Sequence, residues 1–239
     1  LGSRIYIRQP AKGFRSGMDA VFLAAACPAQ PGDHVLEAGC GAGAASLCLF
    51  ARVPGLKITG VEVNPELAWL AKKNAEENGA EPFEAIIADV TSGWSSLKAK
   101  GLKEEAFDHV LANPPYYYQG EGKPAKNLDI ASARAMERGS LDAWLRFLAA
   151  ATRPAGSCTV IYTASELPQL LEAFTGRFGG LRVIPLYPMA EASAIRVIVR
   201  GTKGSRAPLT LERGIVLHDD GGGPSAAADA ILREGKPLL

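Results

Sequence analysis

A short apolar run is followed by a segment that combines a carboxamide, two rigid pyrrolidine rings and a phenol ring, in the order Asn113, Pro114, Pro115 and Tyr116. Each proline fixes its own φ angle and lacks an N–H donor, so the segment presents carbonyl acceptors in a rigid arrangement. The Asn113 side-chain oxygen and the Pro114 carbonyl oxygen could accept both hydrogens of a planar amino group. Tyr116 could stack on the ring that carries this group.

This arrangement suits the methylation of an aromatic or amide nitrogen, whose lone pair is delocalised into the ring or the carbonyl. Two acceptors that hold both amino hydrogens can turn the lone pair toward a methyl donor and stabilise the positive charge that develops. No strong general base is needed, because the methylated nitrogen is acidic enough to lose its proton afterwards. We therefore take Asn113, Pro114, Pro115 and Tyr116 as the candidate catalytic residues.

Upstream, Gly39, Gly41 and Gly43 form a glycine-rich turn between a predicted strand and a predicted helix. Glycines permit a tight turn and a close approach of the backbone to a nucleotide, and the helix start offers unpaired N–H groups. Glu62 ends the next predicted strand, where a carboxylate accepts hydrogen bonds from a ribose diol. The pattern predicts a nucleotide-containing cofactor at this turn.

The same glycines, with Ala44, also satisfy the GxGxxG/A pattern of dinucleotide-dependent dehydrogenases. Two carboxylates favour S-adenosylmethionine instead. Glu37 would repel a pyrophosphate but can accept from the amino group of a methionine moiety, and Asp89 suits the amino group of adenine. Neither carboxylate decides alone, so the segment that begins at Asn113 is the deciding observation.

Around these residues, short apolar runs alternate with amphipathic stretches of helix length. Strands separated by helices predict a parallel, doubly wound sheet with right-handed crossovers. The last two strands are joined by too few residues for a crossover and should pair antiparallel. We expect an α/β fold with a seven-stranded, mostly parallel sheet and an antiparallel C-terminal hairpin. The expected strands are 34–38, 57–62, 83–88, 107–112, 157–162, 181–186 and 194–200, and a short strand is expected in the tail at 215–217.

The composition is that of a globular protein, with 239 residues, 47% hydrophobic, 21% charged and a net charge of +1. No apolar stretch is long enough to predict a membrane span. The cysteines form no CxxC pair, so we expect neither a zinc site nor a disulfide framework, and a cytoplasmic location. The His-Asp-Asp run at 218–220 is expected to be a solvated turn, not a metal site. The four cysteines are Cys27, Cys40, Cys48 and Cys158.

The segments 35–43, 61–79 and 111–120, with a Phe-x-x-Gly-x-Asp-Ala element at 14–20, resemble class I methyltransferases, which have a Rossmann-like fold. Within that group the chain, including its tail at 214–219, is similar to bacterial tRNA adenine-N6-methyltransferases that act on valine tRNA beside the anticodon. The resemblance covers nearly the whole chain. Its motifs specify S-adenosylmethionine and amino methylation well and the RNA poorly.

The resemblance implies a cofactor site in which the first element covers the methionine end. Glu37 departs from the family pattern, because many methyltransferases have Asp there, but the charge is kept. Basic clusters and the tyrosine run suggest RNA contacts, and lysines at 98–103 are expected in a loop. The implied cofactor residues are Gly17, Asp19, Glu37, Gly39, Gly41, Glu62, Asp89 and Asn113. The candidate RNA contacts are Lys12, Tyr117, Lys123 and Arg134.

We expect residues 1–32 to cover cofactor and substrate, 33–200 to form the methyltransferase domain, and 201–239 to pack on it as an extension. The expected reaction is methyl transfer from S-adenosylmethionine to N6 of adenine in RNA. Alternatives are methylation of a protein glutamine amide, of guanine N2 or of adenine in DNA, or a cofactor-binding RNA module without catalysis. Only 38 residues precede Gly39, which disfavours the helical substrate domain of glutamine methyltransferases.

Overall fold

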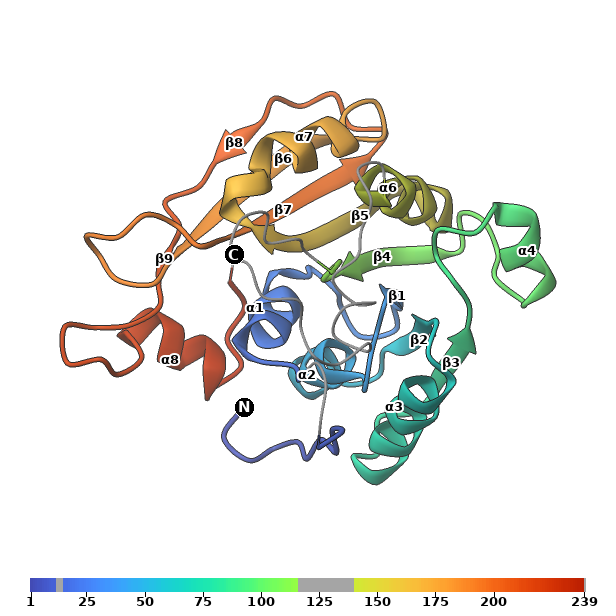
Figure 1. Ribbon diagram of the computed structural model, residues 1–239, viewed down its shortest axis with the longest axis horizontal. Helices are drawn as coiled ribbons and strands as arrows, with labels where there is room; N and C mark the ends of the chain where they lie inside the picture. The colour runs from blue at the N-terminus through green and yellow to red at the C-terminus, as the bar shows by residue number, and fades with distance from the viewer. Residues whose placement is uncertain (12–14, 116–139, 239) are drawn as a thin grey trace, which may run out of the picture.

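A single twisted sheet forms the centre of the computed structural model, which describes residues 1–11, 15–115 and 140–238 (Figure 1). The strands in these ranges are β1 (His34–Ala38), β2 (Lys57–Glu62), β3 (Phe83–Ile87), β4 (Phe107–Ala112), β5 (Thr152–Thr163), β6 (Phe178–Tyr187), β7 (Arg196–Lys203), β8 (Thr210–Leu211) and β9 (Ile215–Val216). The helices are α1 (Met18–Ala26), α2 (Ala44–Arg52), α3 (Pro65–Glu77), α4 (Trp94–Ala99), α6 (Ser140–Ala151), the 3₁₀ turn η1 (Ala164–Glu166), α7 (Leu167–Phe174) and α8 (Ala226–Leu232). None of these helices is long and apolar enough to cross a membrane.

The strands lie in the order β3-β2-β1-β4-β5-β7-β6-β8, and β9 also pairs with β6. Strands β1 to β5 pair in parallel, whereas β7 runs antiparallel to both β5 and β6. The prediction of a mostly parallel sheet with an antiparallel C-terminal hairpin is therefore confirmed. Two short strands extend the predicted seven. Of these, β9 lies within the strand expected at 215–217, and the sequence pattern does not predict β8.

The register of β1 with its two neighbours sets the shape of the carboxyl edge of the sheet. Ala38, the last residue of β1, pairs with Val61 on β2 and with Ala112 on β4. The chain therefore leaves three adjacent strands at nearly the same level, and the residues that follow lie at one edge. In an open α/β sheet this edge is where ligands bind.

Helix α3 begins and ends at residues whose types favour those positions. The Asn64 side-chain oxygen accepts from the backbone N–H groups of Glu66 at 2.9 Å and Leu67 at 3.3 Å, and Pro65 stands at the first helical position. Such a cap satisfies donors that have no partner within the helix. Gly79, with φ of 63°, follows the last turn and ends the helix.

Helix α4 corrects one expectation, since Lys98 lies on this helix and not in a loop with Lys100 and Lys103. Leu97 is 1% exposed and packs into the core against the sheet. A six-residue helix anchored by one buried leucine is too short to show a helical periodicity in the sequence.

Different helices cover the two faces of the sheet (Figure 1). One hydrophobic cluster joins Leu36 and Val110 to α4, α6 and α7. The other joins Val35 and Leu111 to α1, α2 and α8. Neighbouring residues of β1 and β4 thus face opposite ways, as the two-residue repeat of a strand requires, and both faces are buried.

The tail that follows β7 packs against α1. Leu217, Ala228 and Ile231 are buried in the same cluster as α1, and the Leu238 N–H donates to the Ala25 carbonyl oxygen at 2.9 Å. The tail therefore supports α1. The division of the chain at residues 32 and 200 stays a prediction.

This packing predicts that Ile231→Ala destabilises the protein, because Ile231 is only 4% exposed and its removal leaves a cavity between α8 and α1. We expect the free energy of unfolding to fall by about 2–4 kcal/mol in urea titrations. Leu209→Ala, at a position 49% exposed in the same tail, is the control and should cost less than about 0.5 kcal/mol. Equal effects of the two substitutions would contradict a stabilising role for α8.

Candidate functional site

The glycine turn closes directly against the end of β2. Gly39 and Gly41 adopt left-handed backbones with φ of 66° and 53°, and the Gly39 N–H donates to the Val61 carbonyl oxygen at 2.7 Å. A β-carbon at Gly39 would lie 2.6 Å from the Trp144 indole ring on α6, whereas one at Gly41 would meet no atom within 4 Å. Packing against Trp144 therefore requires a glycine at position 39. Gly41 faces open space through which a ligand can approach.

Glu62 and the glycine turn are in direct contact, and the predicted role of Glu62 toward a ribose stays a prediction. The Glu62 side chain is 7% exposed. Its Oε2 accepts from the Gly41 N–H at 2.8 Å, and its Oε1 accepts from the Asn64 N–H at 2.9 Å. Each carboxylate oxygen carries a second lone pair. Glu62 can therefore bridge the turn to α3 and still accept from a hydroxyl.

Glu37 is buried at the end of β1, where it is 5% exposed. Its Oε2 accepts from the Ser46 N–H at 2.8 Å and from the Ser46 hydroxyl at 2.5 Å. Burial raises the pKa of Glu37 to about 7, although both bonds from Ser46 favour the charged form. A cationic amino group placed against Glu37 would favour the carboxylate further. The sequence pattern identifies Glu37 but not its partner Ser46.

Asn113, which follows β4, carries a buried side-chain oxygen to which no described residue donates a hydrogen bond. A buried amide oxygen without a donor costs about 1–3 kcal/mol, and most native structures avoid it. Pro114 beside it is buried and has no N–H to offer. Oδ1 of Asn113 is thus an acceptor at the carboxyl edge, where an amino group of a ligand would satisfy it.

Asp89 lies at the same edge, beyond the end of the outermost parallel strand, β3. Ile87 of β3 pairs with Glu62, and Asp89 follows two residues later, exposed to solvent. Its Oδ1 accepts from the Thr91 N–H at 2.8 Å and from the Thr91 hydroxyl at 2.7 Å. These bonds orient the carboxylate and leave Oδ2 available as an acceptor.

Gly17 and Asp19 stand at the start of α1 and line a cavity of about 250 Å³. Asp19 Oδ2 pairs with Arg196 Nε on β7 at 3.0 Å, and Arg196 and Leu217 also line the cavity. No described residue of the glycine turn lines it. The structure therefore joins Gly17 and Asp19 to β7, and their role toward a cofactor stays a prediction. Nothing in the spacing indicates Arg196, which is 177 residues away.

The remaining predicted residues lie outside the described ranges. One is Tyr116, the last member of the catalytic segment, and the others are the four candidate RNA contacts. Those four are Lys12, Tyr117, Lys123 and Arg134.

The described edge thus unites three kinds of group. These are the open glycine turn, the carboxylates of Glu37, Glu62 and Asp89, and the buried acceptor of Asn113. The carboxylates match a ligand with an amino group and a ribose, and the Asn113 oxygen matches a second amino group that approaches from the β4 side. The donors and acceptors present therefore fit S-adenosylmethionine beside an amino substrate.

Residues 17–140 match the family model of the methyltransferase small domain. A tRNA1(Val) (adenine(37)-N6)-methyltransferase from Shewanella halifaxensis is 28% identical over 167 residues, which are 70% of this chain and 64% of that protein. A protein of the same name from a Flavobacteriaceae bacterium is 33% identical over 112 residues, 46% of this chain and 45% of that protein. The chain thus spans less than two thirds of the length of these relatives.

Solved structures agree on the fold. A protein from Agrobacterium tumefaciens, described as a predicted O-methyltransferase, superposes with a TM-score of 0.77 at 27% identity and covers 92% of this chain and 98% of its own. Precorrin-6y C5,15-methyltransferase from Geobacter metallireducens superposes with a TM-score of 0.53 at 16% identity, covering 78% of this chain and 87% of its own. The second likeness shows the fold alone.

The raised pKa of Glu37 predicts a specific dependence of stability on pH. Between about pH 4.5 and 7 the folded chain binds more protons at Glu37 than the unfolded chain does, so this residue makes the free energy of unfolding fall as the pH rises. The amide that Glu37→Gln introduces cannot ionise and can still accept from Ser46. We expect this variant to match the wild type at pH 4.5 and to exceed it by roughly 3 kcal/mol at pH 8.

Urea unfolding at the two pH values measures this difference. The control is Glu84→Gln, which removes an exposed carboxylate on β3 and should leave the pH dependence close to that of the wild type. If the Glu37→Gln variant is no more stable than the wild type at pH 8, burial of the charged Glu37 carboxylate has no cost in free energy of unfolding.

Proposed function

This chain belongs to the methyltransferase small domain family, and from that membership we propose that it transfers a methyl group from S-adenosylmethionine to N6 of adenine in RNA. The observation that carries the proposal is the buried Asn113 Oδ1, which no described residue satisfies. It lies at the carboxyl edge of the same sheet as the glycine turn.

S-adenosylmethionine supplies an electrophilic methyl group on a sulfonium. Glu37 would accept from the amino group of its methionine part, Glu62 from its ribose hydroxyls and Asp89 from its adenine amino group. The buried Glu37 and Glu62 are already oriented by backbone N–H donors of Ser46, Gly41 and Asn64. These carboxylates need little reorganisation to receive a ligand.

The substrate amino group is held by Asn113. Its Oδ1 accepts one amino hydrogen and the Pro114 carbonyl oxygen accepts the other, so the nitrogen lone pair points away from both acceptors. With the cofactor bound, the new carbon–nitrogen bond would form as the carbon–sulfur bond breaks, and the oxygens of Asn113 and Pro114 would stabilise the positive charge on nitrogen. The nitrogen then loses a proton to solvent.

Two observations support adenine in RNA as the substrate. The curated relatives carry that substrate in their names, and an exocyclic adenine amino group presents two hydrogens to two acceptors. An amide of a protein glutamine has the same two hydrogens. The O-methyltransferase named among the solved structures makes a hydroxyl the third possibility.

The test incubates the protein with methyl-labelled S-adenosylmethionine and total tRNA, digests the RNA and identifies the labelled nucleosides by mass spectrometry. We expect N6-methyladenosine. Label in protein alone would identify a glutamine methyltransferase, and label in 2′-O-methylated nucleosides would identify a hydroxyl acceptor. Either result overturns the proposal.

Asn113→Ala should lower the methylation rate on the order of hundredfold or more, because it removes one oriented partner of the transition state. Affinity for S-adenosylhomocysteine should stay within about twofold, since the three carboxylates are untouched. Single-turnover kinetics and calorimetry separate the two quantities. The control is Glu84→Ala, because Glu84 is exposed on β3. A comparable rate loss in this variant would show that the loss is not specific to Asn113.

Charge reversal at Lys123 should weaken tRNA binding and reduce the slope of log affinity against log salt by about 1, because each phosphate contact releases condensed counterions. Filter binding at several salt concentrations measures the slope. Lys57→Glu is the control, since Lys57 begins β2 at the opposite, amino edge of the sheet and is exposed. An unchanged slope in the Lys123→Glu variant would show that Lys123 does not contact the RNA and that another surface binds it.

A further inference from the structure

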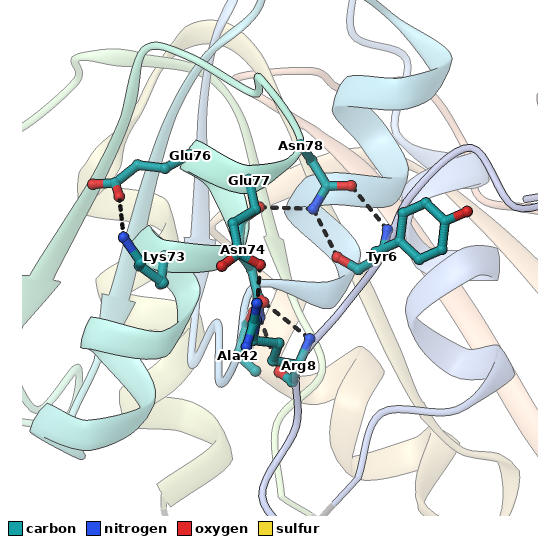
Figure 2. Close-up of polar contacts among 8 residues, drawn as sticks. All are labelled: Tyr6, Arg8, Ala42, Lys73, Asn74, Glu76, Glu77 and Asn78. Atoms are coloured by element: carbon teal, nitrogen blue, oxygen red, sulfur yellow. Dashed lines mark hydrogen bonds and ion pairs between the residues drawn. The ribbon is translucent and has the colours of Figure 1, made fainter.

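The N-terminal segment 5–9, called the strap below, lies along α3 (Figure 2). Ile5 and Ile7 face inward and pack against the hydrophobic clusters below them. Tyr6 and Arg8 alternate with them and are exposed. The strap therefore has the two-residue repeat of a β-strand, although its polar partner is a helix.

Two asparagines of α3 and its C-cap supply the hydrogen bonds that a neighbouring strand would supply. The Tyr6 N–H donates to Asn78 Oδ1 at 2.9 Å, and Asn78 Nδ2 donates to the Tyr6 carbonyl oxygen at 2.7 Å. The Arg8 N–H donates to Asn74 Oδ1 at 2.9 Å, and Asn74 Nδ2 donates to the Arg8 carbonyl oxygen at 3.0 Å. The four-residue spacing of the asparagines matches the two-residue repeat of the strap (Figure 2).

Asn74 makes one contact that Asn78 does not. Its Nδ2 also donates to the carbonyl oxygen of Ala42, inside the glycine turn, at 2.9 Å. The second bond of Asn78 Nδ2 goes instead to the Asn74 carbonyl oxygen of the same helix, at 2.7 Å. Asn74 is 0% exposed, so all its polar atoms depend on protein partners. One buried carboxamide thus joins the strap to the turn.

The strap leads from α3 toward the carboxyl edge. It passes Asn78 before Asn74, so it runs antiparallel to α3, which itself starts just after the carboxyl end of β2. Gln9 Oε1 then accepts from the Ser16 N–H at 2.7 Å, and α1 begins two residues later with Met18. Asn74 therefore links the glycine turn to the segment of the chain that precedes α1.

We propose that Asn74 is a positioning residue of the cofactor site, which couples the conformation of the glycine turn to the attachment of the strap. The inference rests on the proposed function, in that the glycine turn is taken to bind S-adenosylmethionine. Release of the strap would leave the buried Asn74 carboxamide without its two hydrogen bonds to Arg8, and a carboxamide that turned to recover them would lose its bond to the Ala42 carbonyl oxygen. The turn and the strap are therefore ordered together.

Calorimetric titration with S-adenosylhomocysteine tests the coupling in two pairs of variants. Asn74→Ala removes the hydrogen bonds to the strap and the one to the glycine turn. Asn78→Ala removes an equivalent pair of hydrogen bonds to the strap and leaves the turn unchanged. Arg8→Pro removes the backbone N–H that donates a hydrogen bond to Asn74 Oδ1. Arg8→Ala keeps that N–H and loses only the ion pair with Glu77. Arg8 lies on the exposed strap, so Arg8→Pro tests the coupling even if Asn74→Ala fails to fold.

We expect Asn74→Ala and Arg8→Pro to weaken S-adenosylhomocysteine binding about tenfold, and Asn78→Ala and Arg8→Ala to change it less than about twofold. Trypsin cleavage after Arg4 and Arg8, located by mass spectrometry, should be slowed by S-adenosylhomocysteine in the wild type and in Asn78→Ala but not in Asn74→Ala.

Three results overturn the coupling while wild-type binding is intact. These are equal effects of the two asparagine substitutions, normal binding by Arg8→Pro, and cleavage that the ligand does not slow in the wild type. Absence of wild-type binding would instead overturn the proposed function, and this inference with it.

Discussion

The register of β1 between β2 and β4 is the constraint on which the site depends. Ala38 pairs with both Val61 and Ala112, so the glycine turn, Glu62 and Asn113 leave the sheet at one level. A slip of one residue would turn every side chain of β1 to the other face and move Glu37 away from Ser46. Apolar residues on both faces of β1 hold this register, so the packing of the core also sets the geometry of the site.

Around this edge the protein keeps polar groups buried at a cost to stability. Glu37 is buried with a raised pKa, and Asn113 Oδ1 has no donor among the described residues. Apolar residues at these positions would avoid the cost of burying polar groups. Such exceptions concentrate where a ligand supplies the missing partner, and here both stand at the ends of adjacent strands.

The parts of this architecture that depend on local sequence can be predicted from it. Asn64 and Pro65 mark the start of α3, and the glycine turn and Glu62 mark the ends of β1 and β2, because caps, turns and strand ends are encoded within a few residues. The segment proposed to be catalytic stands out in the sequence by its order of residue types, and the catalytic roles of its residues stay a prediction. Tyr116 of that segment also lies outside the described ranges.

The contacts that could not be predicted join residues that are distant in sequence. The pairing of Asp19 with Arg196 and that of Asn74 with Arg8 cross 177 and 66 residues. In the sequence Asn74 is an ordinary polar residue of a helix, and only the folded chain brings it between the strap and the turn. Helix α4 could not be predicted for a different reason, since it rests on a single buried leucine.

The Asn113 edge, as proposed, directs a methyl group to nitrogen. The most direct measurement uses S-adenosylmethionine with a ¹³C-labelled methyl group and RNA whose adenines carry ¹⁵N in the exocyclic amino group. NMR of the product should show a one-bond carbon–nitrogen coupling on the transferred methyl. A labelled methyl group in the RNA without that coupling would contradict the claim.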